Sequence, residues 1–183
     1  MNSSVANLIA EIIRIEGGYS NDPNDSGGET MYGITIREAR KNGYTGSMKD
    51  MPKHIAENIY EMIYWYEPGF YDVSMVYPAV AKELFDTGVN CGTGKAAEFL
   101  QITLNALNRQ GKDYPDIDED SDIGPATIKA LEAYKAHRGA EGESVLLKAL
   151  NCLQGARYIE LSRVRQKDEK YVYGWLQNRV VLT

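Results

Sequence analysis

An amphipathic helix that ends abruptly at two glycines is the feature that most limits how this chain folds. Apolar residues recur at helical spacing near the start of the chain, which predicts one buried face. They are Val5, Leu8, Ile9, Ile12 and Ile13. A glycine directly after the last turn, here Gly17, is a common left-handed helix cap. Glu16 is therefore expected at the C-terminus of this helix, where the chain turns sharply at the edge of a cleft.

Residues 20–33 form the long polar segment of the first half. They are rich in Asn, Asp, Ser, Gly and Pro, which predicts tight turns and a short irregular hairpin. The segment also contributes three acidic residues to a group of carboxylates set among glycines. Its members are Glu16, Asp22, Asp25 and Glu29.

Most of the remaining chain has helical periodicity. Thr35 and Glu38 have the spacing of a capping box, which predicts that a short helix begins there. Further helices are expected over residues 52–66, 78–89, 96–107, 125–134 and about 143–167, with a break at Gly92-Thr93-Gly94. The sequence has no fixed-period repeat and no linker-like stretch. A mainly α protein is expected, with both halves packed into one globule.

Composition excludes several classes of function. The net charge of -6 and the pI near 5.0 argue against a nucleic-acid partner, because such binding depends on Lys and Arg. Cys91 and Cys152 belong to no redox motif and are expected to be reduced. The N-terminus has neither a basic region nor a long apolar run, which predicts no signal peptide and no membrane span.

The inventory of reactive residues leaves carboxylate chemistry. His54 and His137 are the two histidines, with no HExxH motif, so a zinc hydrolase is not expected. GxSxG, Walker and GxGxxG motifs are absent. The acidic run 116–122 has Ser121 where a calcium-binding EF-hand loop needs Gly. No metal and no cofactor are therefore expected.

Two carboxylates in different surroundings suit glycoside hydrolysis. One carboxylic acid protonates the leaving oxygen, and a second carboxylate positions water or stabilises the cationic transition state. Apolar neighbours such as Ile15 and Tyr19 would favour the protonated form of Glu16, whereas Asp25 in a polar turn would stay ionised. The alternative is that Glu16 is a solvated helix end and Asp25 caps backbone amides. The residues alone leave both interpretations open.

The motifs E-G-G-Y at 16–19 and D-P-N-D-S-G-G-E-T-M-Y-G-I-T at 22–35 resemble glycoside hydrolase family 108, a group of bacterial and phage N-acetylmuramidases. The resemblance implies that Glu16 is the catalytic acid. The order Glu, eight residues, Asp, then Thr is similar to T-even phage lysozymes and implies roles for Asp25 and Thr30, although the gap to Thr30 is one residue shorter. It also implies a lysozyme-like fold with a small irregular or β element next to the active-site cleft. Tyr19 and Tyr32 flank these residues and are candidates for substrate binding.

The second half resembles the helical peptidoglycan-binding region that follows this catalytic segment. The residues that carry the resemblance are 85–90, 92–97, 100–101, 122–127 and 174–180. The expected domains are residues 1–90 and 91–183. Five basic residues lie on or after the last predicted helix, either as the outer face of a packing helix or as a transient contact with an anionic membrane. They are Arg157, Arg163, Arg165, Lys167 and Lys170.

These resemblances together imply an endolysin that hydrolyses the β-1,4 bond between N-acetylmuramic acid and N-acetylglucosamine in peptidoglycan. Such a protein is expected to be a monomer, to be made in the host cytoplasm, and to reach the wall after release by a holin. Two alternatives stay open: a lytic transglycosylase, and a non-catalytic peptidoglycan-binding or secretion-related protein. Whether the reaction inverts or retains configuration depends on the separation of the two carboxylates.

Overall fold

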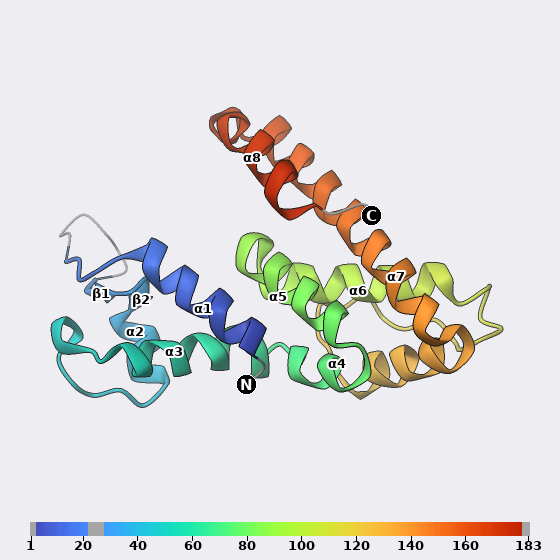
Figure 1. The fold of residues 1–183 in the computed structure, drawn as a ribbon, viewed down its shortest axis with the longest axis horizontal. Helices are drawn as coiled ribbons and strands as arrows, with labels where there is room; N and C mark the ends of the chain where they lie inside the picture. The colour runs from blue at the N-terminus through green and yellow to red at the C-terminus, as the bar shows by residue number, and fades with distance from the viewer. Residues whose placement is uncertain (1–2, 22–27, 181–183) are drawn as a thin grey trace. The chain divides into compact units, whose positions relative to one another are not determined.

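The computed structural model describes residues 3–21 and 28–180 of the chain (Figure 1). The chain divides into two compact units, Met1–Tyr66 and Glu67–Thr183. Helices make up most of both units, and one two-stranded sheet lies in the first. The expectation of a mainly α fold with a small β element is therefore confirmed.

The first unit is built on two helices that pack together, α1 (Ser3–Glu16) and α3 (Lys53–Glu61) (Figure 1). Val5, Ile9 and Ile13 on α1 are buried, which confirms the predicted apolar face. Ala56 and Ile59 on α3 are also buried. A stripe of side chains three and four residues apart thus anchors each helix in the core of this unit.

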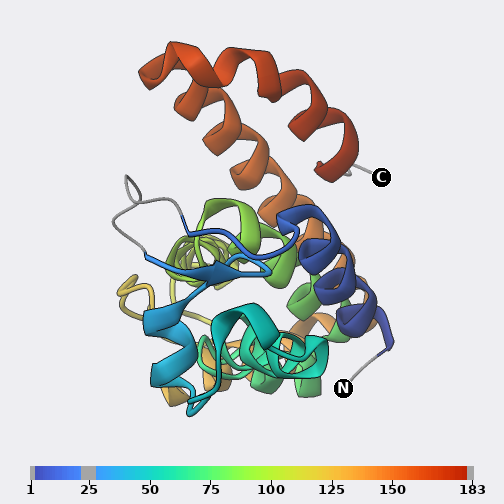
Figure 2. The ribbon, with the colours of Figure 1, turned by 90° about the vertical axis from the view of Figure 1, so that its left-hand side faces the viewer.

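A short hairpin follows α1 in the sequence. Strands β1 (Thr30–Met31) and β2 (Ile34–Thr35) form a small antiparallel hairpin (Figure 2). In its register Thr30 lies opposite Thr35. Both central residues of the turn have positive φ, 55° at Tyr32 and 77° at Gly33, as in a type I′ turn. The backbones of Ser20 and Thr30 also exchange hydrogen bonds of 3.0 and 2.9 Å. The expected hairpin is therefore present, with Thr30 paired on both sides.

Helix α2 (Ile36–Lys41) begins directly after the hairpin. The Thr35 hydroxyl accepts a hydrogen bond from the Glu38 amide at 3.2 Å, and the Glu38 carboxylate accepts one from the Thr35 amide at 3.1 Å. This confirms the predicted capping box. The chain then passes through η1 (Met48–Asp50) to α3.

The predicted helix over residues 52–66 does not continue as a single α-helix. Helix α3 ends at Glu61, and the chain continues as a π-helix, η2 (Met62–Tyr66). A π-helix has wider turns than an α-helix and frequently occurs at functional sites. Trp65 is buried in this segment.

The second unit consists of α4 (Phe70–Val76), α5 (Pro78–Cys91), α6 (Thr93–Leu107), α7 (Pro125–Val164), η3 (Gln166–Asp168) and α8 (Glu169–Arg179) (Figure 1). Helices α4, α5, α6 and α7 pack together, and α8 folds back against α7. Its core contains fully buried Phe70, Leu84, Leu100 and Leu146.

Four features of this unit differ from the sequence prediction. The break expected at residues 92–94 is confined to Gly92, because Thr93 and Gly94 already belong to α6. The helices expected over 125–134 and 143–167 form α7, which is interrupted at Gly139, where φ is 60° and ψ is -148°. Helix α7 ends at Val164 rather than near residue 167. The 78–89 helix extends further than expected, to Cys91.

Among the described residues, no helix combines the length and apolar character needed to span a membrane.

Candidate functional site

Glu16 is the last residue of α1, and its side chain is exposed. The helix ends there because Gly17 takes a φ of 81°, while the Gly17 amide still donates to the Ile13 carbonyl at 3.3 Å. This matches the expected left-handed cap. The expected apolar cover differs, however, because Ile15 is 64% exposed and Tyr19 is 39% exposed. These two neighbours therefore provide little shielding for the carboxylate.

The hairpin turn supports the Glu16 side chain instead. A Cβ atom placed on Gly33 would lie 2.9 Å from Cγ of Glu16 and 3.0 Å from its Cβ. These distances are shorter than van der Waals contact, so the stem of Glu16 rests directly on the bare backbone of Gly33. The turn between β1 and β2 thus lies against the end of α1, although 15 residues separate Glu16 from Tyr32.

Two tyrosines of the α3 and η2 region complete the surroundings of Glu16. The Tyr60 hydroxyl donates a hydrogen bond of 2.9 Å to the Tyr32 carbonyl, and the rings of Tyr60 and Tyr64 stack with centroids 5.8 Å apart. Burial raises the pKa of Tyr60, and the nearby acidic groups of Glu16, Tyr64 and Glu38 raise it further. The pKa of Tyr64 is raised by burial and then by Glu38 and Glu16. Both carboxylates thus act electrostatically on the same tyrosine pair.

The structure brings some of the predicted site residues together. Glu16 and the backbone of Tyr32 meet around Gly33 and Tyr60. Thr30 is half-buried in the hairpin, where its backbone is paired with Ser20. Asp25 lies outside the described residues. The catalytic and substrate-binding roles assigned from the sequence stay predictions.

Glu38, Tyr60 and Tyr64 are site neighbours that the sequence reasoning did not nominate. Glu38 was identified by its spacing from Thr35 as a helix cap, and its nearness to the tyrosine pair depends on the fold. Tyr60 and Tyr64 are four residues apart, so the spacing itself indicates that they share a helix face. That signal could have paired the two rings, although it could not have placed them beside Glu16.

A separate hollow of about 390 Å³ lies in the first unit between the loop after α2 and the helix α3. Uncharged residues line it: Asn42, Gly43, Tyr44, Thr45, Gly46, Ile55, Asn58, Ile59 and Met62. Since no carboxylate is among them, this hollow supplies no group for acid–base chemistry.

Residues of the 85–90 motif contact neighbouring helices of the second unit. Asp86 accepts hydrogen bonds from Arg179 at 2.5 Å and from Gln154 at 3.2 Å, and Thr87 accepts one from Gln154 at 3.1 Å. This network joins α5, α7 and α8. Gly88 lets the Phe70 ring approach, since a Cβ there would lie 3.1 Å from that ring. The 85–90 motif therefore has a structural role in holding the helices together.

The acidic loop after α6 is tied to that helix by side-chain amides. The Gln101 amide donates to the Asp120 carboxylate at 2.7 Å, and Asn108 donates to Asp116 at 2.5 Å. Asn105 donates to the Ile117 carbonyl at 2.9 Å. Among the described residues, no group of three or more His, Cys, Asp or Glu side chains is arranged to hold a metal ion.

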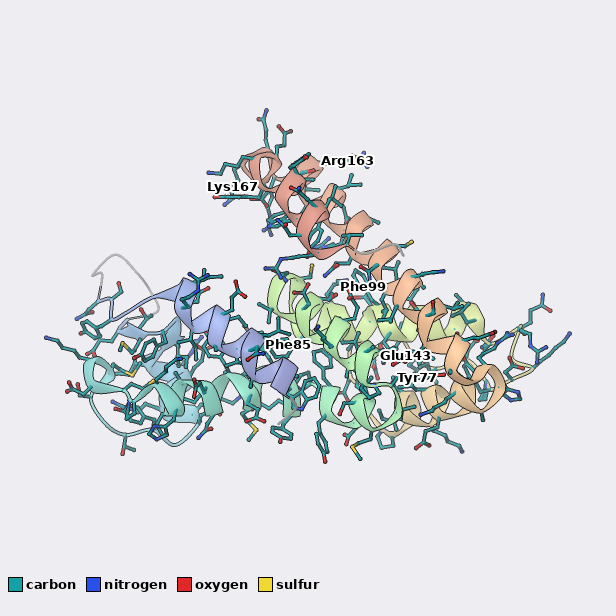
Figure 3. The ribbon with its side chains drawn as sticks, in the orientation of Figure 1. Tyr77, Phe85, Phe99, Glu143, Arg163 and Lys167 are labelled. Atoms are coloured by element: carbon teal, nitrogen blue, oxygen red, sulfur yellow. The ribbon has the colours of Figure 1, made fainter. Side chains whose placement is uncertain are left out.

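Two of the basic residues near the C-terminus make contacts within the second unit, one as an ion pair and one with an aromatic ring. Arg157 pairs with Glu160 at 2.6 Å, and the Lys170 ammonium lies 4.7 Å from the Tyr171 ring centroid. Arg163 and Lys167 lie where α7 gives way to α8, at the far end of this helical pair (Figure 3). Contact of this surface with an anionic membrane stays a prediction.

Comparison with known proteins places the first half in a class of glycoside hydrolases. Residues 9–92 match the family described as Glycosyl hydrolase 108, and residues 95–180 match the family described as Predicted Peptidoglycan domain. The two matches together give the chain a glycosyl hydrolase 108 region followed by a C-terminal peptidoglycan domain, which supports a glycoside hydrolase that acts on peptidoglycan. The first match runs past Tyr66 and includes α4 and α5 of the second unit.

The fold also resembles a solved structure, that of Brucella abortus SagA. The TM-score is 0.56 at 20% sequence identity, and the similarity covers 98% of this chain and 97% of that one. At this identity the likeness concerns the fold. A search of curated proteins finds no significant match.

Proposed function

We propose that this protein hydrolyses the β-1,4 bond between N-acetylmuramic acid and N-acetylglucosamine in peptidoglycan, with Glu16 as the general acid. The observation that carries the proposal is the position of Glu16 within the glycosyl hydrolase 108 match. Its carboxylate stands at an exposed helix end, while its stem is seated on Gly33. A bulky polymer can reach such a group, and the packed stem limits its orientations.

In the proposed reaction, the Glu16 carboxylic acid protonates the glycosidic oxygen as the bond to the anomeric carbon breaks. Asp25 places the water that attacks this carbon and accepts the proton that the water loses. Thr30 is proposed to assist Asp25, and Tyr19 is proposed to stack on a sugar ring. Tyr19 suits that task because the residue is 39% exposed. The reaction requires no cofactor.

Replacing Glu16 by Gln tests the proposal most directly. Gln cannot protonate the leaving oxygen, so release of new reducing ends from purified peptidoglycan should fall by at least about 10³-fold. Because Glu16 is exposed, the unfolding midpoint should stay within about 1 °C of wild type. The Gln side chain also preserves the packing of the stem against Gly33.

Glu11→Gln is the matched control. Glu11 lies on the same helix, is exposed, and pairs with Arg14 at 3.6 Å. This variant should keep full activity. Near-wild-type activity of Glu16→Gln would refute the assignment of the acid. Mass spectrometry of the wild-type products provides a second test, since anhydromuramic ends would show a lytic transglycosylase, and binding without cleavage would show a non-catalytic wall-binding protein.

A further inference from the structure

Two side chains that are distant from each other in the sequence converge on Gly33. The stem of Glu16 comes from the end of α1, the Tyr60 hydroxyl comes from α3, and Gly33 itself belongs to the hairpin turn. A Cβ on Gly33 would lie 2.7 Å from the Tyr60 hydroxyl oxygen and 2.9 Å from Cγ of Glu16. Both distances are too short for real atoms. The space beside Gly33 is therefore filled by these two side chains.

The turn itself has a backbone that needs support. Tyr32 has a φ of 55°, a left-handed conformation that non-glycine residues seldom adopt. Its carbonyl accepts the hydrogen bond from Tyr60, whose side chain is held in the core at 7% exposure and stacked on Tyr64. A buried and stacked ring keeps its hydroxyl in one place. The Tyr60 hydroxyl is thus a rigidly held hydrogen-bond donor that fixes the strained turn.

We propose that Tyr60 is a positioning residue for the candidate acid. Its hydroxyl fixes the Tyr32–Gly33 turn, and this turn packs against the Glu16 side chain and so holds its carboxylate in one orientation. This inference rests on the proposed function. Tyr60 is given no contact with the substrate. Tyr60 acts through the turn, which sets the orientation of the Glu16 carboxylate. This orientation affects the rate because small displacements of a reacting group lower the rate by large factors.

The hydroxyl is suited to this task across the working pH range. Burial and the nearby charge of Glu16 both raise the pKa of Tyr60, so the hydroxyl keeps its proton and stays a donor. Phenylalanine would retain the ring stack but would leave the Tyr32 carbonyl without this donor.

The first test is Tyr60→Phe, assayed as the rate of reducing-end release against the concentration of solubilised peptidoglycan chains. The expected result is a fall in kcat of about 10- to 100-fold with KM within about twofold of wild type. A purely structural role would lower the fraction of folded enzyme, which circular dichroism at the assay temperature measures separately. Tyr60→Phe with a wild-type kcat overturns the proposal.

Tyr44→Phe is the matched control for this substitution. The Tyr44 hydroxyl also donates to a backbone carbonyl, that of Ser47 at 2.8 Å, but it does so in an exposed loop. Removing it deletes the same kind of hydrogen bond in the same unit. Its kcat should equal that of wild type, and an equal loss in both variants would overturn the specific role of Tyr60.

A double-mutant cycle with Gly33→Ala tests the convergence itself. In wild type the new methyl group would meet the Tyr60 hydroxyl, so kcat should fall at least about 100-fold. The Tyr60→Phe variant lacks the hydroxyl oxygen, which is the closest of the clashing atoms. In that background the fold decrease in kcat caused by Gly33→Ala should be at least about fivefold smaller than in wild type. Equal costs in the two backgrounds would show that the groups are not coupled.

Two further measurements separate the possible failures. Gly111→Ala controls for backbone strain, because Gly111 has a φ of 73° with nothing within 4 Å of its would-be Cβ, and its kcat should be unchanged. Amide hydrogen exchange should be faster around Tyr32 and Gly33 in Tyr60→Phe than in wild type, and unchanged exchange would overturn the proposal. If wild type releases no reducing ends, the proposed function fails; if wild type is active and Tyr60→Phe matches it, this inference alone fails.

Discussion

The two compact units use irregular backbone for different purposes. In the first unit, positive φ angles at Gly17, Tyr32 and Gly33 gather around the candidate acid. In the second, non-glycine residues with positive φ lie in the connection between α6 and α7, for example Arg109 and Ser121. There, side-chain amides tie the loop to α6. Backbone with positive φ in the first unit thus surrounds the candidate site, whereas in the second unit it lies in a connection between two helices.

The units also differ in where their polar groups lie. The carboxylate of Glu16 is exposed, whereas Gln154 in the second unit is fully buried and bonded to Asp86 and Thr87. Buried polar groups stabilise a fold only while their partners are present. We therefore expect changes in the second unit to act mainly on stability, and changes around Glu16 to act mainly on catalysis.

The largest stability effect is expected from Leu146→Ala in the core of the second unit. Leu146 on α7 is fully buried, and its truncation removes apolar burial and leaves a cavity, at a cost of about 3 kcal/mol in the free energy of unfolding. Its neighbour Val145 is 45% exposed, so Val145→Ala should change stability by less than about 0.5 kcal/mol. Urea denaturation measures both. Similar costs for the two variants would contradict the assignment of Leu146 to the core.

A smaller effect, with the opposite sign, is expected at Glu83 on α5. Burial raises the pKa of this carboxyl to about 7, and the charge of Asp86 adds to the rise, while Asn151 and Lys82 partly offset it. Because the pKa is higher in the folded protein than in the unfolded chain, folding favours the protonated carboxyl, and at low pH this group costs no stability. Stability is then lost as the pH rises through about 7. Glu83→Gln should remove that loss, making the variant more stable at pH 8 by about 2 kcal/mol.

The measurement is urea denaturation of wild type and Glu83→Gln at pH 4.5 and pH 8. The difference between the two proteins should be near zero at the lower pH and should favour the variant at the higher one. Glu141→Gln, at an exposed position on α7, controls for the general loss of a negative charge. A variant that is less stable than wild type at pH 8 would show that Glu83 makes favourable contacts as an anion.

Much of the fold could be predicted from local patterns. The apolar stripe of α1, the Thr35–Glu38 cap and the separation of the two parts of α7 are each set by residues close together in the sequence. Helix α4 was not predicted, because its beginning depends on a contact across the fold. Gly69 before it packs against Ile123, and a Cβ there would lie 2.9 Å from the Ile123 carbonyl oxygen.

The candidate site follows the same division. Glu16 could be nominated from the sequence, because its place before Gly17 is a local feature. Its support by Tyr60 could not, since that contact spans two elements far apart in the chain. The expectation that Ile15 shields the carboxylate was wrong, because the last turn of α1 points this side chain towards solvent.

The smallest effect tests whether the first unit depends on its local polar contacts. The Thr35 hydroxyl accepts a hydrogen bond from the Glu38 amide and donates one of 2.9 Å to the Glu38 carboxylate. Thr35→Ala removes both bonds from a helix of six residues and should lower the free energy of unfolding by about 1 kcal/mol. Ser47→Ala is the matched control, because Ser47 is the N-cap of η1 and makes no side-chain capping bond; this substitution should leave the free energy of unfolding close to that of wild type. Equal midpoints of denaturation for the two variants would mean that the capping box contributes little, and that the first unit, like the second, depends mainly on its buried side chains.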